Sequence, residues 1–381
     1  MEAYFDNAAT TKVFPEVKDL VVKLMEEDYG NPSSLHQKGL DAGHYIKETK
    51  EILAKEWKVD SKEIVLTSGG TESNNLALIG AALANKRSGN RIITSKVEHA
   101  SVSSTIAFLE SLGFEVIYLD VDSHGIVDLK QLEQEVNEDT ILVSIMYVNN
   151  EIGAVEPIEE IAEIIKEKNS KTLFHVDAIQ AFGKYHIYPK RIGIDLMSVS
   201  GHKIHGPKGT GALFIKSRTK VQPIIYGGGQ QDGMRSGTEN VPGFGGFGLA
   251  TKMVYEDLEA RTVRMRAVKD RLTERLKTLP NVYINEGKAP HILSVSFVGV
   301  RSEVMLHALE ERQIYVSSGS ACSSNKPSVS RVLASIGLPK DRLESTIRFS
   351  FSAENTVEQA DYAADVIEEI LPVYRKYVRK K

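Results

Sequence analysis

The stretch EIVLTSGGTESNN, residues 63–75, indicates the fold class of this chain. Residues 63–67 form a short, mostly apolar run typical of a strand, and two glycines then lead into a segment with helical spacing. A glycine turn that opens a helix presents free backbone N–H groups at the positive end of the helix dipole, which suits a phosphate. We therefore expect a strand, an anion-binding turn and a helix.

The same alternation of helix-like and strand-like segments extends from about residue 15 to residue 216. Apolar residues recur at helical spacing in three places: Val17, Leu20, Val21 and Leu24; Leu76, Ile79, Gly80 and Leu83; and Ile158, Ile161, Ala162 and Ile165. This pattern predicts an α/β fold with a mostly parallel seven-stranded sheet flanked by helices. The seven expected strands are 63–67, 91–95, 115–119, 140–148, 172–177, 195–200 and 211–216.

The pattern changes after the glycine-rich run at residues 226–248. We expect a long charged helical stretch from about 249 to 277, followed by strands near 292–298 and 346–351 and helices near 302–311 and 356–379. These elements suggest a smaller α+β domain. The predicted domains are a large one of residues 15–256 and a small one made of residues 1–14 and 257–381.

Composition excludes several classes of protein. The 381 residues carry a formal net charge of −4, which lacks the basic surface that direct nucleic-acid binding requires. The single cysteine, Cys322, rules out an internal disulfide and a cysteine-rich zinc site, so no resident metal is expected. The first residues lack the features of a signal peptide, and no stretch approaches a membrane span. We expect a cytoplasmic protein with no membrane partner.

Polar side chains follow the expected strands where each one ends. In open α/β sheets the ligand lies outside the carboxyl ends of the strands. His99 follows 91–95, Asn150 follows 140–148, Asp177 ends 172–177, and Lys203 follows 195–200. Alone, each has a common structural explanation, such as a solvated lysine or a helix-capping aspartate. Together they match pyridoxal 5′-phosphate, which needs a lysine for a Schiff base, a carboxylate for its ring nitrogen and donors around its phosphate.

Further motifs support that hypothesis. They include YFDNAATT (4–11), GNPSSLH (30–36), SGHKIHGPKG (200–209), RSGT (235–238), SSGSACSS (317–324) and IRFS (347–350). With these motifs the chain resembles, nearly end to end, the NifS/IscS-type cysteine desulfurases, in the class V branch of fold-type I pyridoxal-phosphate enzymes.

The resemblance implies a role for each strand-end residue. Lys203 would carry the cofactor as a Schiff base, Asp177 would pair with the ring nitrogen, and Gln180 would bond the phenolic oxygen. His99 would stack on the ring and move protons. Arg348 would grip the substrate carboxylate with its two-pronged guanidinium, and Asn150 would lie beside the ring and the substrate. The phosphate would be held by Gly70, Thr71, Ser200, His202 and, from the partner subunit of a homodimer, the residue corresponding to Thr238.

The resemblance also explains why Cys322 lies in a polar stretch. Its thiolate would take the sulfur of L-cysteine as a persulfide and release L-alanine. A sulfur-acceptor protein would then receive the sulfur, for iron–sulfur cluster assembly or tRNA thiolation. The only metal chemistry implied is a transient iron–sulfur ligation by Cys322.

Two other functions compete with this one. A selenocysteine lyase or an aminotransferase would use the same cofactor but would not depend on Cys322. A non-catalytic sulfur-relay protein on a degenerate fold is disfavoured because Lys203, Asp177 and His99 are all present.

Overall fold

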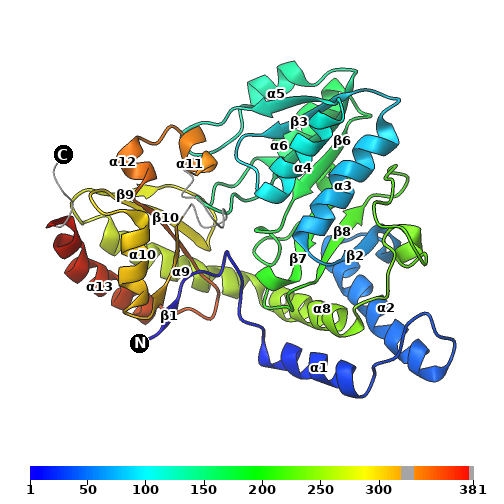
Figure 1. The fold of residues 1–381 in the computed structure, drawn as a ribbon, viewed down its shortest axis with the longest axis horizontal. Coiled ribbons are helices and arrows are strands. Elements are labelled where there is room, and N and C mark those ends of the chain that lie inside the picture. The colour runs from blue at the N-terminus through cyan, green and yellow to red at the C-terminus, as the bar shows by residue number, and fades with distance from the viewer. Residues whose placement is uncertain (319–329, 377–381) are drawn as a thin grey trace.

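A seven-stranded sheet forms the centre of the larger of two lobes in the computed structural model, which describes residues 1–318 and 330–376 (Figure 1). The strand order is β2-β8-β7-β6-β5-β3-β4, and only β8 runs antiparallel to its neighbours. The predicted mostly parallel sheet is therefore confirmed, and the carboxyl ends of the other six strands lie at one edge. The strands are β2 (Ile64–Thr67), β3 (Arg91–Ser95), β4 (Glu115–Leu119), β5 (Thr140–Met146), β6 (Leu173–Asp177), β7 (Leu196–Ser200) and β8 (Gly211–Ile215).

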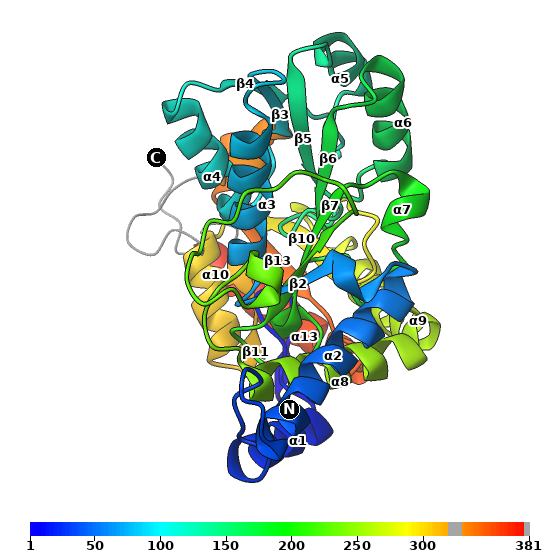
Figure 2. The ribbon, with the colours of Figure 1, turned by 90° about the vertical axis from the view of Figure 1, so that its right-hand side faces the viewer.

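Helices cover both faces of this sheet (Figures 1 and 2). On one face α3 (Gly70–Asn85) and α4 (Ala100–Ser111) bury Leu76 and Ile106 in one apolar cluster. The cluster on the other face includes Trp57 of α2 (Gln37–Trp57) and Phe247 of α8 (Val241–Glu256). In α6 (Ile158–Lys168) the four residues predicted to share an apolar face are all buried. The remaining helices of this lobe are α1 (Pro15–Glu26), α5 (Leu129–Glu135), α7 (Pro189–Ile192) and the short 3-10 helices Ser61–Glu63, Gly201–Lys203 and Gln231–Gly233.

The helical stretch expected over 249–277 is divided between two helices. The chain forms α8, which ends at Glu256, and a separate helix α9 (Leu258–Leu276). Asp257 between them has φ −133° and ψ 30°, which no helix continues through. The break is needed because Phe247 of α8 packs in the core of the large lobe, whereas Leu272 of α9 packs in that of the smaller lobe.

The smaller lobe is built on a four-stranded antiparallel sheet in the order β12-β13-β10-β9, with a two-stranded parallel pair β1-β11 beside it. Phe5, next to β1, packs edge-on against Phe351 at 5.1 Å between ring centroids, so the first residues of the chain join this core. The domain boundaries at 14 and 256 stay a prediction. The elements are β1 (Ala3–Tyr4), β9 (Val282–Asn285), β10 (Ile292–Phe297), α10 (Ser302–Glu310), β11 (Ile314–Tyr315), β12 (Ser317–Ser318), α11 (Arg331–Ser335), α12 (Lys340–Leu343), β13 (Thr346–Ser350) and α13 (Val357–Lys376).

Within residues 1–318 and 330–376, every helix is too short or too polar to cross a bilayer.

Candidate active site

One pocket of about 510 Å³ lies at the carboxyl ends of the strands and collects the predicted site residues. Three parts of the chain form it: the strand ends of the large sheet, the segment after β1, and Arg348 on β13 with Ser317 on β12 of the smaller lobe. Its lining comprises Asp6, Ala8, Ala9, Gly70, Thr71, His99, Ser101, Met146, Val148, Asn150, Asp177, Ile179, Gln180, Ser200, His202, Lys203, Ser317 and Arg348.

Two predicted residues are absent from this lining. Thr238 is exposed, in the segment between β8 and α8, and does not line the pocket. Cys322 lies outside the described residues.

Lys203 enters the pocket from the 3-10 turn that directly follows β7. Its Nζ donates to the backbone carbonyls of Ala8 and Ala9, the latter at 2.8 Å. Nδ1 of the neighbouring His202 is hydrogen-bonded to the hydroxyl oxygen of Thr10, at 3.2 Å. Burial, helped by the charge of Lys203, lowers the pKa of His202 to about 4, so this imidazole is neutral near pH 7.

Asp177 is the last residue of β6, and its register partner on β7 is Ser198. The carboxylate accepts from Asn74 Nδ2 at 2.9 Å and from the backbone N–H of Ile179 at 3.0 Å. Burial raises the pKa of Asp177, because the charged form has lost its hydration. A cationic partner facing this carboxylate from the pocket would favour its ionised form.

His99 caps the N-terminus of α4. Its Nδ1 accepts from the backbone N–H of Ser101 at 3.1 Å and lies 2.8 Å from the Ser101 hydroxyl. That hydroxyl in turn accepts from Asn74 at 2.9 Å, so one amide side chain connects the His99 and Asp177 sites. Burial lowers the pKa of His99, so the ring is neutral near pH 7 and carries one proton. Because Nδ1 accepts from the backbone N–H of Ser101, that proton is on Nε2.

The neighbour of His99 in the chain, Glu98, is a buried carboxyl. Its Oε1 accepts from Ser95 Oγ at 2.7 Å and from the backbone N–H of Met146 at 3.0 Å. Burial raises the pKa of Glu98 to about 8. Glu98 is thus uncharged near pH 7 and does not add a second negative charge near Asp177.

The glycine turn before α3 has a backbone that only glycine adopts readily. Gly69 has φ +146°, and a Cβ on Gly70 would stand 2.1 Å from Cδ1 of Ile179. Because α3 begins at Gly70, its first N–H groups lie at the pocket, where Gly70 and Thr71 form part of the lining. The turn therefore presents backbone N–H groups that suit an anion, and phosphate binding by Gly70 and Thr71 stays a prediction.

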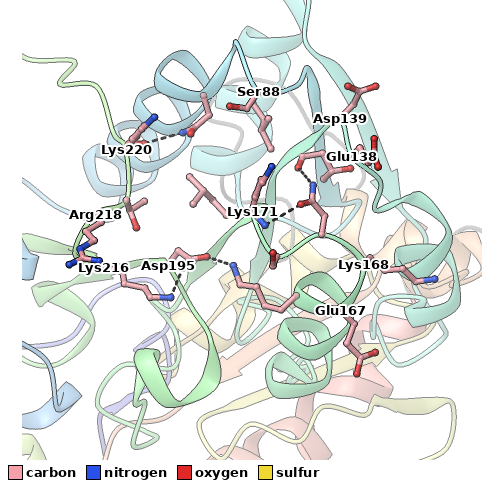
Figure 3. A pocket seen from close by; sticks show the side chains of 18 of the residues that line it. Ser88, Glu138, Asp139, Glu167, Lys168, Lys171, Asp195, Lys216, Arg218 and Lys220 are labelled. Carbon is pink, nitrogen blue, oxygen red and sulfur yellow. Dashed lines mark hydrogen bonds and ion pairs between the residues drawn. The ribbon is translucent and has the colours of Figure 1, made fainter.

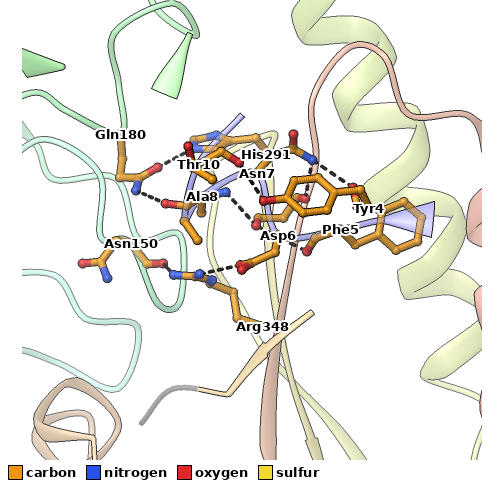
Figure 4. A network of polar contacts seen from close by, with 12 residues as sticks. Tyr4, Phe5, Asp6, Asn7, Ala8, Thr10, Asn150, Gln180, His291 and Arg348 are labelled. Atoms are coloured by element: carbon orange, nitrogen blue, oxygen red, sulfur yellow. Dashed lines mark hydrogen bonds and ion pairs between the residues drawn. The ribbon is translucent and has the colours of Figure 1, made fainter. Parts of the chain in front are cut away.

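Arg348 is the basic residue of the smaller lobe that lines the pocket (Figure 4). One terminal nitrogen donates to the backbone carbonyl of Asn150 at 2.9 Å, and the other lies 2.8 Å from the carboxylate of Asp6. Its Nε is buried and has no hydrogen-bond partner among the described residues. The guanidinium is thus held in place and keeps donors for a further carboxylate.

Three residues of this site were missed by the sequence reasoning. Asp6 lies in the quoted motif YFDNAATT but received no role. Asn74 lies one helical turn after Gly70, a spacing that places both on the same face of α3, and this signal could have identified it. Nothing in the sequence alone pointed to Ser101.

These side chains fit pyridoxal phosphate by their chemistry. The glycine cradle matches its phosphate, the desolvated carboxylate of Asp177 matches its ring nitrogen, and Lys203 supplies the amine.

A larger hollow of about 1050 Å³ lies at the opposite edge of the sheet (Figure 3). Its buried carboxylate, Asp195, is already neutralised by Lys166 at 2.6 Å and Lys216 at 3.0 Å. The predicted site residues do not line it. Size therefore does not identify the active site here.

Comparisons with known proteins agree with this geometry. A family model described as aminotransferase class-V matches residues 3–362. A cysteine desulfurase IscS of Methanosarcina thermophila is 41% identical over 375 residues, which cover 98% of this chain and 92% of that protein. A solved structure described as a NifS-like protein has a TM-score of 0.93 at 39% identity and covers 98% of this chain and 100% of its own. Another solved structure, described as SspA in complex with cysteine, has a TM-score of 0.80 at 34% identity. The match covers 92% of this chain and 98% of that one.

Class-V aminotransferases and cysteine desulfurases depend in general on pyridoxal phosphate, and the desulfurases act on L-cysteine. Because the family model spans most of the chain and the relatives match it nearly end to end, the chain belongs to the class-V aminotransferase family and, within it, to the cysteine desulfurases of the IscS and NifS type.

Proposed function

We propose that this chain converts L-cysteine to L-alanine with pyridoxal 5′-phosphate held in the 510 Å³ pocket, and that the sulfur passes to Cys322 as a persulfide. The observation that supports this most is that Lys203, Asp177, His99 and Arg348 line one pocket although they come from four different segments. A selenocysteine lyase or an aminotransferase would share this pocket, and the role of Cys322 separates them from a desulfurase.

These residues would hold the cofactor. Lys203 Nζ would form the covalent link, Asp177 would accept from the ring nitrogen, and Gln180 would donate to the phenolic oxygen. Gly70, Thr71, Ser200 and His202 would hold the phosphate, together with Thr238 from the second subunit of a homodimer. Asn74 and Ile179 keep the Asp177 carboxylate oriented, at 2.9 and 3.0 Å.

Bound pyridoxal phosphate supplies an electron sink that makes the α-proton of cysteine acidic and its carbon–sulfur bond labile. Arg348 binds the substrate carboxylate beside Asn150, which orients the amino acid. Lys203 would supply the amine that removes the α-proton. His99 holds an exchangeable proton on Nε2, because Ser101 fixes its Nδ1 as an acceptor.

Sulfur transfer then occurs at Cys322. The thiolate attacks the substrate sulfur, a sulfur–sulfur bond forms, and the carbon–sulfur bond breaks with its electron pair left on carbon. That carbon takes up a proton, and the product is alanine. The persulfide is delivered to an acceptor protein of iron–sulfur cluster assembly or tRNA thiolation. A free reactive thiol of this kind functions in a reducing compartment, which we take to be the cytoplasm.

The test of the cofactor assignment is covalent trapping. Protein incubated with pyridoxal phosphate should turn yellow, and borohydride should fix the cofactor to the peptide that contains Lys203. A competing amine makes the experiment discriminating: burial lowers the pKa of Lys184 to about 7, and its Nζ lies 2.7 Å from the carbonyl oxygen of Lys203. Labelling of Lys184 instead, or turnover of cysteine at a wild-type rate by Lys203→Ala, would show that the lysine is misassigned.

A further inference from the structure

The side-chain amide of Gln180 lies between two parts of the chain outside the large sheet (Figure 4). Its nitrogen, Nε2, lies 3.0 Å from the backbone carbonyl of Ala8, in the segment after β1. Its oxygen, Oε1, lies 3.4 Å from Nε2 of His291, directly before β10 of the smaller lobe. Gln180 is buried and also lines the pocket.

The carbonyl of Ala8 decides which way this amide points. A carbonyl oxygen only accepts, so the Gln180 atom 3.0 Å from it must be the nitrogen. The oxygen then faces His291, and an amide oxygen also only accepts. His291 Nε2 must therefore carry a proton and donate it to Gln180.

The surroundings of His291 allow this tautomer. Its side chain is 1% exposed, and burial lowers its pKa well below the usual value, so the ring is neutral and carries one proton. Nδ1 is buried and has no partner among the described residues. His291 also borders a small chamber of about 20 Å³ shared with Lys184 and Lys203, which has the volume of one water.

We infer that His291 is a positioning residue that holds the Gln180 amide with an N–H directed into the cofactor pocket. This inference rests on the proposed function, because the N–H of Gln180 has a task only if a cofactor oxygen accepts from it. Without the His291 donor, the amide keeps its bond to the Ala8 carbonyl but loses the bond that holds its oxygen, so its second N–H is no longer fixed toward the pocket. His291 itself lines the chamber and not the pocket, so it acts through Gln180.

The readout is the pH at which the absorption band of the Lys203-linked cofactor changes. A donor to the phenolic oxygen weakens that oxygen's hold on the proton shared with the linkage nitrogen, so losing the donor should raise the midpoint pH. One lost hydrogen bond of about 1 kcal/mol corresponds to a shift of roughly 0.7 pH unit. We expect this upward shift in His291→Leu and in Gln180→Met. His291→Gln, whose amide nitrogen can replace Nε2, should restore the wild-type midpoint.

A double-variant cycle separates positioning from a general structural effect. If His291 acts through Gln180, then His291→Leu added to Gln180→Met should shift the midpoint no further. Additive shifts, or an unchanged midpoint in cofactor-loaded His291→Leu, would overturn the inference. If His291→Leu does not fold, His291→Gln is compared with His291→Asn, whose shorter amide should fail to restore the midpoint; equal midpoints would again overturn it. Failure of the wild type to link the cofactor to Lys203 would reject the proposed function instead, and borohydride trapping detects this separately.

Discussion

The carboxylate of Asp6 lies 2.8 Å from the guanidinium of Arg348, although 342 residues separate them in the chain. Both side chains are largely buried: that of Asp6 is 21% exposed and that of Arg348 is 9% exposed. Asp6 therefore compensates the charge of an arginine that would otherwise be costly to bury. It uses one terminal nitrogen and leaves other donors of Arg348 for the proposed contact with a substrate carboxylate.

Replacing Arg348 with lysine should impair binding of cysteine more than the chemistry that follows. The ammonium keeps the charge but loses the two-pronged geometry, so KM should rise about 10–100-fold. Steady-state kinetics with L-cysteine measure this. Cysteamine, which lacks the carboxylate, should perturb the cofactor spectrum equally well in both proteins. Arg342→Lys is a matched control outside the pocket, where Arg342 bonds Asn285. A similar KM increase in Arg342→Lys would contradict the assignment.

Replacing Cys322 with alanine should separate cofactor chemistry from sulfur transfer. The variant should bind pyridoxal phosphate and respond spectrally to cysteine, because the pocket residues are intact. Persulfide and sulfide formation should fall to background, since no thiolate accepts the sulfur. Near-normal turnover in Cys322→Ala would favour the lyase or aminotransferase alternative.

Alkaline pH should destabilise the protein through Glu156, a buried carboxyl that does not line the pocket. Burial raises the folded-state pKa of Glu156 from 4.5 to about 8. The folded state therefore binds more protons than the unfolded state between these values, and this contribution to stability is lost as the pH rises from 4.5 through 8. Glu156→Gln, which imitates the neutral acid, should reduce the fall in Tm between pH 5.5 and 8.5 by about 2–5 °C.

Glu160→Gln is the control for this measurement, because Glu160 is exposed on α6. It should retain the pH dependence of the wild type. If Glu156→Gln shows the same slope as Glu160→Gln, the carboxyl of Glu156 is not the group that titrates.

Mixed dimers should show whether the active site is shared between subunits. Thr238→Glu would place a carboxylate against the partner's phosphate, and Lys203→Ala removes the covalent link, so each homodimer should be inactive. In a heterodimer of the two, one site combines an intact Lys203 with an intact Thr238, and activity should return to at most about half per dimer. Inactive, verified heterodimers would reject the role of Thr238 across the interface and leave the desulfurase assignment in place.

The order of the elements, and the positions of the reactive side chains along them, could be predicted from the sequence. Period-2 and period-3.6 patterns are local, so the seven strands and the buried face of α6 could be predicted within a few residues. Asp177 and Lys203 could be placed together because residues after parallel strands share one sheet edge. The break at Asp257 could not be predicted, because α8 and α9 are both helical locally and differ only in the core on which they pack.

How the pocket residues are held depends on the three-dimensional packing of distant segments. Asp6 contacts Arg348, Asn74 contacts Asp177, and His291 contacts Gln180 across 342, 103 and 111 residues of chain. The partners in these contacts cannot be read from the sequence, since those of Asp6 and His291 depend on how the first residues and the smaller lobe pack against the strand ends, and that of Asn74 depends on how α3 packs on the sheet. Patterning determines which face of an element is buried, whereas the partner of a buried polar group is determined by the three-dimensional packing around it.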